Sequence, residues 1–175
     1  MASGTSAAPE GAIHRELQLA EAQKFIEHEA DLLDEQSFDE WLELFADDGY
    51  YWVPARAGQE SPLTHVSLFY DDKPTLKIRV ERLKHPQIHS QTPRSKTVRL
   101  VSNFRLLPSE DGSPDERCVT SKFVMLEDRS GVERRLFGGR YTYRLRAVSG
   151  GLRIVWKRVD LTDCDQFFSS LTQPF

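Results

Sequence analysis

The N-terminal third of the chain carries hydrophobic residues at helical spacing. From Ile13 to about Glu35 it contains neither proline nor glycine. Its apolar side chains recur along one broad stripe, at Leu17, Ala20, Phe25, Ile26, Leu32 and Leu33. This periodicity predicts an amphipathic helix. We expect its acidic residues on the solvated or partner-facing side of the helix, at Glu27, Glu29, Asp31 and Asp34.

A second, short helix and a strand are predicted directly afterwards. Ser37, followed three residues later by Glu40, is typical of a capping box at a helix start. The apolar side chains of this helix should point inward, at Trp41, Leu42, Leu44 and Phe45. The aromatic and β-branched run at 50–53 then favours a strand that Pro54 ends. Residues 66–70 form a possible short strand, and the helical spacing at 75–83 predicts a helix that stops before Pro86.

The second half of the chain changes to period-two patterning. Val98, Leu100 and Phe104 alternate with polar residues, and so do Tyr141, Tyr143 and Leu145, while the segments 119–126, 136–148 and 152–159 are predicted as the further strands. A polar loop at 108–116 and a tight turn at 149–151 separate these segments. Helices followed by long antiparallel strands predict an α+β domain, with the N-terminal helices packed on one face of a curved antiparallel sheet.

Composition narrows the functional classes. The chain has 175 residues, with 23 basic and 27 acidic side chains and a net charge of −4. This balance argues against nucleic-acid binding, which needs a basic excess, and no apolar run has the length of a membrane span. We expect residues 1–12 to form a disordered tail and residues 13–175 a single domain. Two cysteines, Cys118 and Cys164, fit free thiols in the cytoplasm.

The histidines and cysteines offer little support for a metal site. His85 and His89 have the spacing of two ligands on one helical face, but Pro86 follows the first directly, so a solvated loop is the default. A Rieske iron–sulfur cluster needs two cysteines and two histidines in close pairs. The two cysteines are far apart in the sequence, and neither has a histidine nearby. We therefore expect no metal and no cofactor in this chain.

His28 is the main candidate for acid–base chemistry. It shares a helix face with Phe25 and Leu32, and a pocket that includes Asp31, Asp48 and Tyr50 would let it act as a general base. The alternative is a structural histidine under the sheet.

Arginines and phenylalanines of the C-terminal half are candidates for a subunit interface. Arg140, Arg144 and Arg146 share one face of a predicted strand, which is either a solvated edge or a contact with carboxylates of a partner. The apolar C-terminus, with Phe167, Phe168 and Phe175, favours the subunit contact.

Four segments, in order, resemble the small (β) subunits of aromatic-ring-hydroxylating dioxygenases, the Rieske non-haem iron oxygenases. They are FIEHEADLLDEQSFDEWLELFADDGYYWVP, YDDKPTLKIRVERLKH, TPRSKTVRLVSNFRL and KRVDLTDCDQFFSSLTQPF. The first matches a family helix with an E-A-x-L-L-D core, then D-x-W-L-x-L-F and an aromatic pair leading into proline. The resemblance extends from about Leu19 to Phe175.

The resemblance implies a cone-shaped fold of the nuclear-transport-factor-2-like (cystatin-like) kind. It also implies a non-catalytic subunit that supports iron-bearing α subunits. In the family, α holds the Rieske [2Fe-2S] cluster and a mononuclear Fe(II), and β forms a trimer within an α3β3 hexamer. The enzyme hydroxylates aromatic compounds with O2 and NADH-derived electrons. The alternative is a stand-alone isomerase or dehydratase of the same fold that uses a His/Asp pair in a cavity of its own.

Overall fold

Helices form the first part of the chain and strands most of the rest. The computed structural model describes residues 10–85, 93–108, 115–131, 134–166, 168 and 171–175. The elements in chain order are α1 (Glu10–Asp34), α2 (Phe38–Glu43), β1 (Phe45–Pro54), β2 (Ser67–Asp72), α3 (Lys73–Lys84), β3 (Lys96–Leu107), β4 (Glu116–Asp128), β5 (Arg135–Val148) and β6 (Gly151–Leu161). The predicted α+β class and the order of its elements are confirmed.

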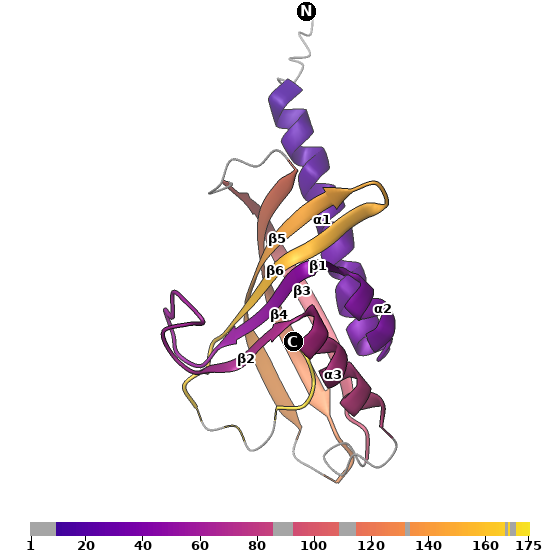
Figure 1. The fold of residues 1–175 in the computed structure, drawn as a ribbon, viewed down its shortest axis with the longest axis vertical. Coiled ribbons are helices and arrows are strands. Elements are labelled where there is room, and N and C mark those ends of the chain that lie inside the picture. Colours follow the sequence, from indigo (N-terminus) through magenta and orange to yellow (C-terminus); the bar gives the residue numbers. More distant parts are fainter. Residues whose placement is uncertain (1–9, 86–92, 109–114, 132–133, 167, 169–170) are drawn as a thin grey trace, which may run out of the picture.

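The strands form one curved sheet in the order β2-β1-β6-β5-β4-β3, and the helices lie against one of its faces (Figure 1). Strands β3 to β6 form the expected antiparallel meander, whereas β1 pairs with β6 in parallel. In β3, Asn103 has a φ of 57° where the register with β4 shifts, and a bulge of this kind bends a strand. Gly139 lets β5 approach β6, since a Cβ there would lie 2.0 Å from the carbonyl oxygen of Asp160.

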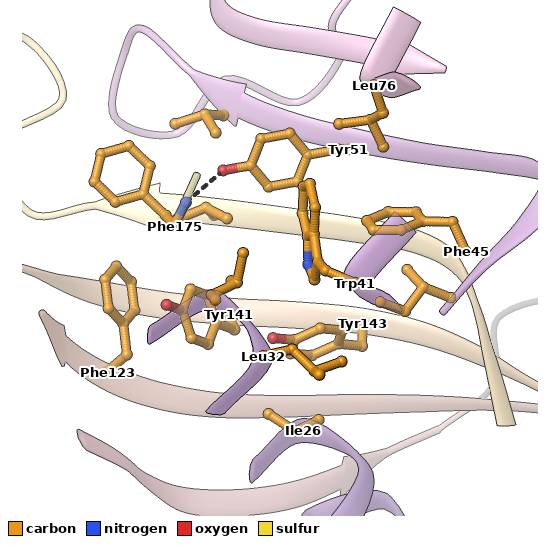
Figure 2. Close-up of a cluster of buried hydrophobic side chains, with 14 of the residues drawn as sticks. Ile26, Leu32, Trp41, Phe45, Tyr51, Leu76, Phe123, Tyr141, Tyr143 and Phe175 are labelled. Atoms are coloured by element: carbon orange, nitrogen blue, oxygen red, sulfur yellow. Dashed lines mark hydrogen bonds between the residues drawn. The ribbon is translucent and has the colours of Figure 1, made fainter. Parts of the chain in front are cut away.

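Alternation along the strands places one set of side chains under the helices. In β4, Val119, Phe123 and Met125 are buried on the inner face, while Lys122 and Val124 between them are exposed. Such alternation is what a sheet covered on one face produces. Large buried side chains from both layers, such as Trp41, Tyr51 and Tyr141, meet between the helices and the sheet (Figure 2).

The short second helix is held by aromatic packing. Trp41 of α2 is fully buried, and its ring meets Phe45 at 5.3 Å and Tyr51 at 6.0 Å between centroids, both edge to face. The predicted capping box is wrong, because the side chain of Ser37 makes no capping hydrogen bond. By contrast, α3 has a side-chain cap, in which Asp72 accepts a hydrogen bond from the backbone N–H of Thr75 at 2.9 Å.

Several element bounds differ from the prediction. Helix α1 begins at Glu10 and not at Ile13, and β1 begins at Phe45, so this residue belongs to the strand and not to the second helix. Strand β2 extends to Asp72 and leads directly into α3. The loop predicted at 108–116 falls largely outside the described residues, whereas the turn at 149–150 is confirmed.

Three tyrosines on the inner face determine how the fold responds to alkaline pH. Tyr51, Tyr141 and Tyr143 are each at most 2% exposed. Burial raises the pKa of all three hydroxyls above the ordinary value of 10.0. A folded-state pKa above the unfolded one contributes stability that is present below pH 10 and lost as the pH rises above it.

We expect cooperative alkaline unfolding above pH 10. Each buried tyrosine lowers the free energy of unfolding by up to about 1.4 kcal/mol per pH unit there. The measurement follows tyrosinate absorbance and helical circular dichroism together across this range. Replacing an outer-face tyrosine that is 37% exposed, Tyr50→Phe, is the matched control and should leave the unfolding midpoint unchanged. Ionisation of all three buried tyrosines in a protein that keeps its circular dichroism would contradict the expectation.

Candidate functional site

A buried carboxylate lies at the centre of the interior. Glu29 of α1 is 1% exposed. Its two oxygens accept hydrogen bonds from Trp41 Nε1 of α2 at 2.9 Å, Tyr143 Oη of β5 at 2.7 Å and Lys157 Nζ of β6 at 2.8 Å. Burial lowers the pKa of the Lys157 ammonium, and the neighbouring Glu29 carboxylate opposes that shift. The cluster therefore joins α1 and α2 to the middle of the sheet.

A second buried cation lies on β3. The side chain of Arg99 is 1% exposed and forms an ion pair with Asp34 near the end of α1. It also donates to Thr97 Oγ1 at 2.9 Å and to the carbonyl oxygen of Pro174 at 2.6 Å. The two buried cations, Arg99 and Lys157, thus fix two places along the first helix to the sheet.

The C-terminal residues occupy the space between these groups. Lys157 Nζ donates to the backbone oxygen of Phe175 at 2.7 Å, and the Phe175 N–H donates to Tyr51 Oη at 2.9 Å (Figure 2). The Phe175 ring lies among the rings of Phe69, Phe123 and Phe137. The polar groups that converge in the interior therefore bind one another and the chain's own end.

The four residues of the alternative, catalytic interpretation do not assemble into a pocket. His28 and Asp31 are both exposed on α1, so His28 is neither a general base in a pocket nor a structural histidine under the sheet. Asp48 is exposed and accepts hydrogen bonds from Arg146 at 2.9 Å, which lowers the pKa of its carboxyl. Tyr50 is 37% exposed and stacks on Tyr70 with 5.6 Å between centroids, on the sheet face opposite the core.

The predicted positions of two acidic residues of α1 are wrong. The prediction places Glu29 and Asp34 on the solvated or partner-facing side of the first helix, but Glu29 is buried and Asp34 is half-buried against Arg99. A signal was present in the sequence: Glu29 follows the buried Ile26 by three residues and precedes Leu33 by four, which places it inside the apolar stripe.

The predicted interface arginines have different environments. Arg140 is exposed on the outer face of β5. Arg144 pairs with Glu116 at 3.1 Å, and Arg146 pairs with both Asp48 and Glu116 at 2.9 Å. Two of the three therefore already hold carboxylates of their own chain.

The predicted interface phenylalanines also lie in different environments. Phe168 is half-buried and lies 6.2 Å from the ring of Phe137. Phe175 is 1% exposed and belongs to the core, because its ring fills the interior described above, so it is not on an outer surface in this conformation. Phe167 lies outside the described residues. A role of Arg140, Arg144, Arg146, Phe167 and Phe168 in subunit contacts stays a prediction.

An apolar patch lies on the outer face of β3, β4 and β5. The backbone register places Leu100 opposite Val124, and Leu126 opposite both Val98 and Leu136. Leu100 is 70% exposed, Leu136 68%, Val98 57% and Val124 45%. We call these five residues the outer patch. Exposed apolar side chains gathered in one place mark surfaces that bind other molecules.

The described part of the chain contains neither a metal-binding cluster nor a membrane-spanning helix. Within the described ranges, no three histidine, cysteine, aspartate or glutamate side chains lie together in a way that would hold a metal ion. His85 is exposed, and His89 lies outside those ranges. None of the described helices combines the length and hydrophobicity that crossing a membrane requires. Cys118 and Cys164 form no disulfide, and their side chains are half-buried and buried respectively.

Comparison with known proteins assigns the chain to a family. Residues 28–165 match the family model described as ring hydroxylating beta subunit. The small oxygenase component of the p-cumate 2,3-dioxygenase system of Pseudomonas putida is 39% identical over 141 residues, which are 79% of this chain and 76% of that protein.

Solved structures agree on the fold. The β subunit of benzoate 1,2-dioxygenase from Burkholderia mallei superposes with a TM-score of 0.71 at 24% identity, over 86% of this chain and 95% of that one. An NTF2-like protein with a cystatin-like fold from Novosphingobium aromaticivorans gives a TM-score of 0.58 at 17% identity, over 91% and 93%. The predicted nuclear-transport-factor-2-like fold is confirmed. Together with the family match, this places the chain among the β subunits of the ring-hydroxylating dioxygenases.

Proposed function

We propose that this chain assembles as a trimer that supports iron-bearing α subunits in an α3β3 ring-hydroxylating oxygenase. The α subunits would carry the Rieske [2Fe-2S] cluster and the mononuclear Fe(II). The assembly would work in the cytoplasm and hydroxylate an aromatic compound with O2 and NADH-derived electrons. The two free cysteines fit a reducing compartment. The relatives named for p-cumate and benzoate support an aromatic substrate.

The observation that carries the proposal is the contrast between the two faces of the sheet. On the inner face, Glu29, Arg99 and Lys157 are bound by side chains and backbone of the same chain. On the outer face, the outer patch leaves apolar side chains up to 70% exposed. A small enzyme of this fold needs the reverse, with polar groups that converge on an accessible cavity.

The first experiment measures native mass and iron content of the chain alone and co-expressed with a candidate α subunit. We expect an iron-free trimer alone and a larger, iron-bearing assembly with ring-hydroxylating activity after co-expression. A monomer that does not bind α and converts a substrate by itself would contradict the proposal. That result would favour the alternative, a stand-alone isomerase or dehydratase.

The outer patch provides a test of self-association. We expect Leu100→Glu to raise the concentration at which the trimer dissociates about tenfold or more, because association would bury an unpaired carboxylate. Native mass across a dilution series measures this effect. Leu63→Glu is the matched control, since Leu63 is 83% exposed in the loop between β1 and β2, away from the patch. A Leu100→Glu trimer as tight as the unsubstituted one would remove the patch from the self-association interface.

The Glu29 cluster provides a test of structural against catalytic roles. Glu29→Gln leaves Lys157 as a buried charge without its counter-ion, so we expect the free energy of unfolding to fall by about 3–5 kcal/mol. Turnover per assembled α3β3 complex should be unchanged. Chemical denaturation measures the first quantity and substrate oxidation the second.

The exposed Glu27→Gln on the same helix is the control for this substitution, and its effect on stability should stay within about 0.5 kcal/mol. Loss of turnover in a Glu29→Gln complex of normal stability and normal iron content would show that the carboxylate takes part in chemistry.

A further inference from the structure

The last two described residues are held by every strand of the sheet. Three side chains bind their backbone: Tyr51 of β1 accepts from the Phe175 N–H, Arg99 of β3 donates to the Pro174 oxygen, and Lys157 of β6 donates to the Phe175 oxygen. These three side chains are themselves 0% to 7% exposed as residues. The backbone hydrogen-bonding groups of the two residues are therefore satisfied by side chains and not by a neighbouring strand.

The aromatic ring of Phe175 is enclosed by the remaining three strands. Its centroid lies 5.1 Å from the ring of Phe137 on β5 in an edge-to-face arrangement, 6.4 Å from Phe69 on β2 and 6.5 Å from Phe123 on β4. Aromatic contacts of this kind stabilise a fold by more than the free energy of burying their apolar area. Each of the six strands thus contributes one side chain to the contact with Pro174 and Phe175.

Both buried cations of this set bind backbone oxygens of the C-terminal residues. Buried charges are costly unless their donors are bound, and here Pro174 accepts from Arg99 and Phe175 accepts from Lys157. Asp34 and Glu29 hold the same two cations from the opposite side, through α1. Both donors are therefore also held by groups that do not belong to the C-terminal residues.

We propose that the interior of the cone is a peptide-recognition site whose ligand is the chain's own Gln173–Phe175 segment. Tyr51, Arg99 and Lys157 bind the backbone of the Pro-Phe pair. The surrounding phenylalanine rings select an aromatic side chain at the last position. The site accepts the same sequence as a separate peptide once the segment is removed. This property does not depend on the α subunit or on the oligomeric state.

The test uses a variant that ends at Thr172 and a synthetic peptide with the sequence of residues 171–175, LTQPF. We expect the peptide to bind the truncated protein saturably, with a rise in its unfolding temperature and a change in fluorescence of Trp41, which packs against Tyr51. The intact chain should not bind it, because its site is filled. A peptide that ends in alanine in place of phenylalanine should bind at least tenfold more weakly.

Two substitutions in the truncated protein distinguish specific from non-specific binding of the peptide. Tyr51→Phe removes only the acceptor for the Phe175 N–H and should weaken binding about threefold to tenfold. Tyr70→Phe makes the same chemical change on the outer face of β2 and should leave binding unchanged. Equal binding of the phenylalanine and alanine peptides, or equal effects of the two substitutions, would overturn the proposal.

A truncated protein that does not fold is also informative. Recovery of helical circular dichroism on adding the LTQPF peptide, and not the alanine peptide, supports the site. If neither peptide restores the fold, the full-length Phe175→Ala variant is titrated with LTQPF, which should displace its weakened segment. A folded variant, truncated or Phe175→Ala, that binds no LTQPF at millimolar concentration would rule the site out.

Discussion

The buried ion pair between Glu29 and Lys157 joins the first helix to the last strand, and the rest of the interior is arranged around it. Trp41 and Tyr143 complete the carboxylate's shell, so α2 and β5 are fixed to the same point. The ammonium group's further bond to Phe175 fixes the C-terminal residues there as well. A pair at this depth needs every polar atom satisfied, since desolvation otherwise exceeds the Coulombic gain. That requirement explains why helices, strands and chain end all converge on it.

The pair also separates the chemistry of this chain from that of an enzyme. Catalytic carboxylates and lysines need access to a substrate and freedom to exchange protons. Glu29 instead accepts three hydrogen bonds from its own chain, and Lys157 divides its donors between Glu29 and a backbone oxygen. The space between the helices and the sheet encloses the chain's own C-terminal segment. Membership of the dioxygenase β-subunit family agrees with an interior used for stability.

The outer face has the opposite character. Arg144 and Arg146 bind acidic residues within the chain, while the outer patch remains open across three strands. On β5, Arg144 and Arg146 lie eight and ten positions from Leu136, so the ion pairs and the outer patch occupy different parts of the strand. Exposed apolar surface of this kind is typical of sites that bind other molecules. The inner face of the sheet therefore closes the core of the chain, and the outer face leaves the patch exposed.

The sequence by itself determined the element types, their order and the family. Helical and alternating periodicities are local properties, and each of the four matching segments is an uninterrupted stretch of sequence. It also determined the meander, since strands joined by short turns pair with their neighbours. The parallel pairing of β1 with β6 was decided only by the tertiary structure, because the two strands lie at opposite ends of the sheet-forming sequence and no short turn joins them. The same holds for Glu29, whose partner Lys157 is 128 positions away, and for Phe175, whose apolar character fits a core as well as a surface. From sequence alone, a charged residue in a helix is predicted to be exposed to solvent. Its burial requires a partner of opposite charge, and only the folded chain brings a distant partner within hydrogen-bonding distance.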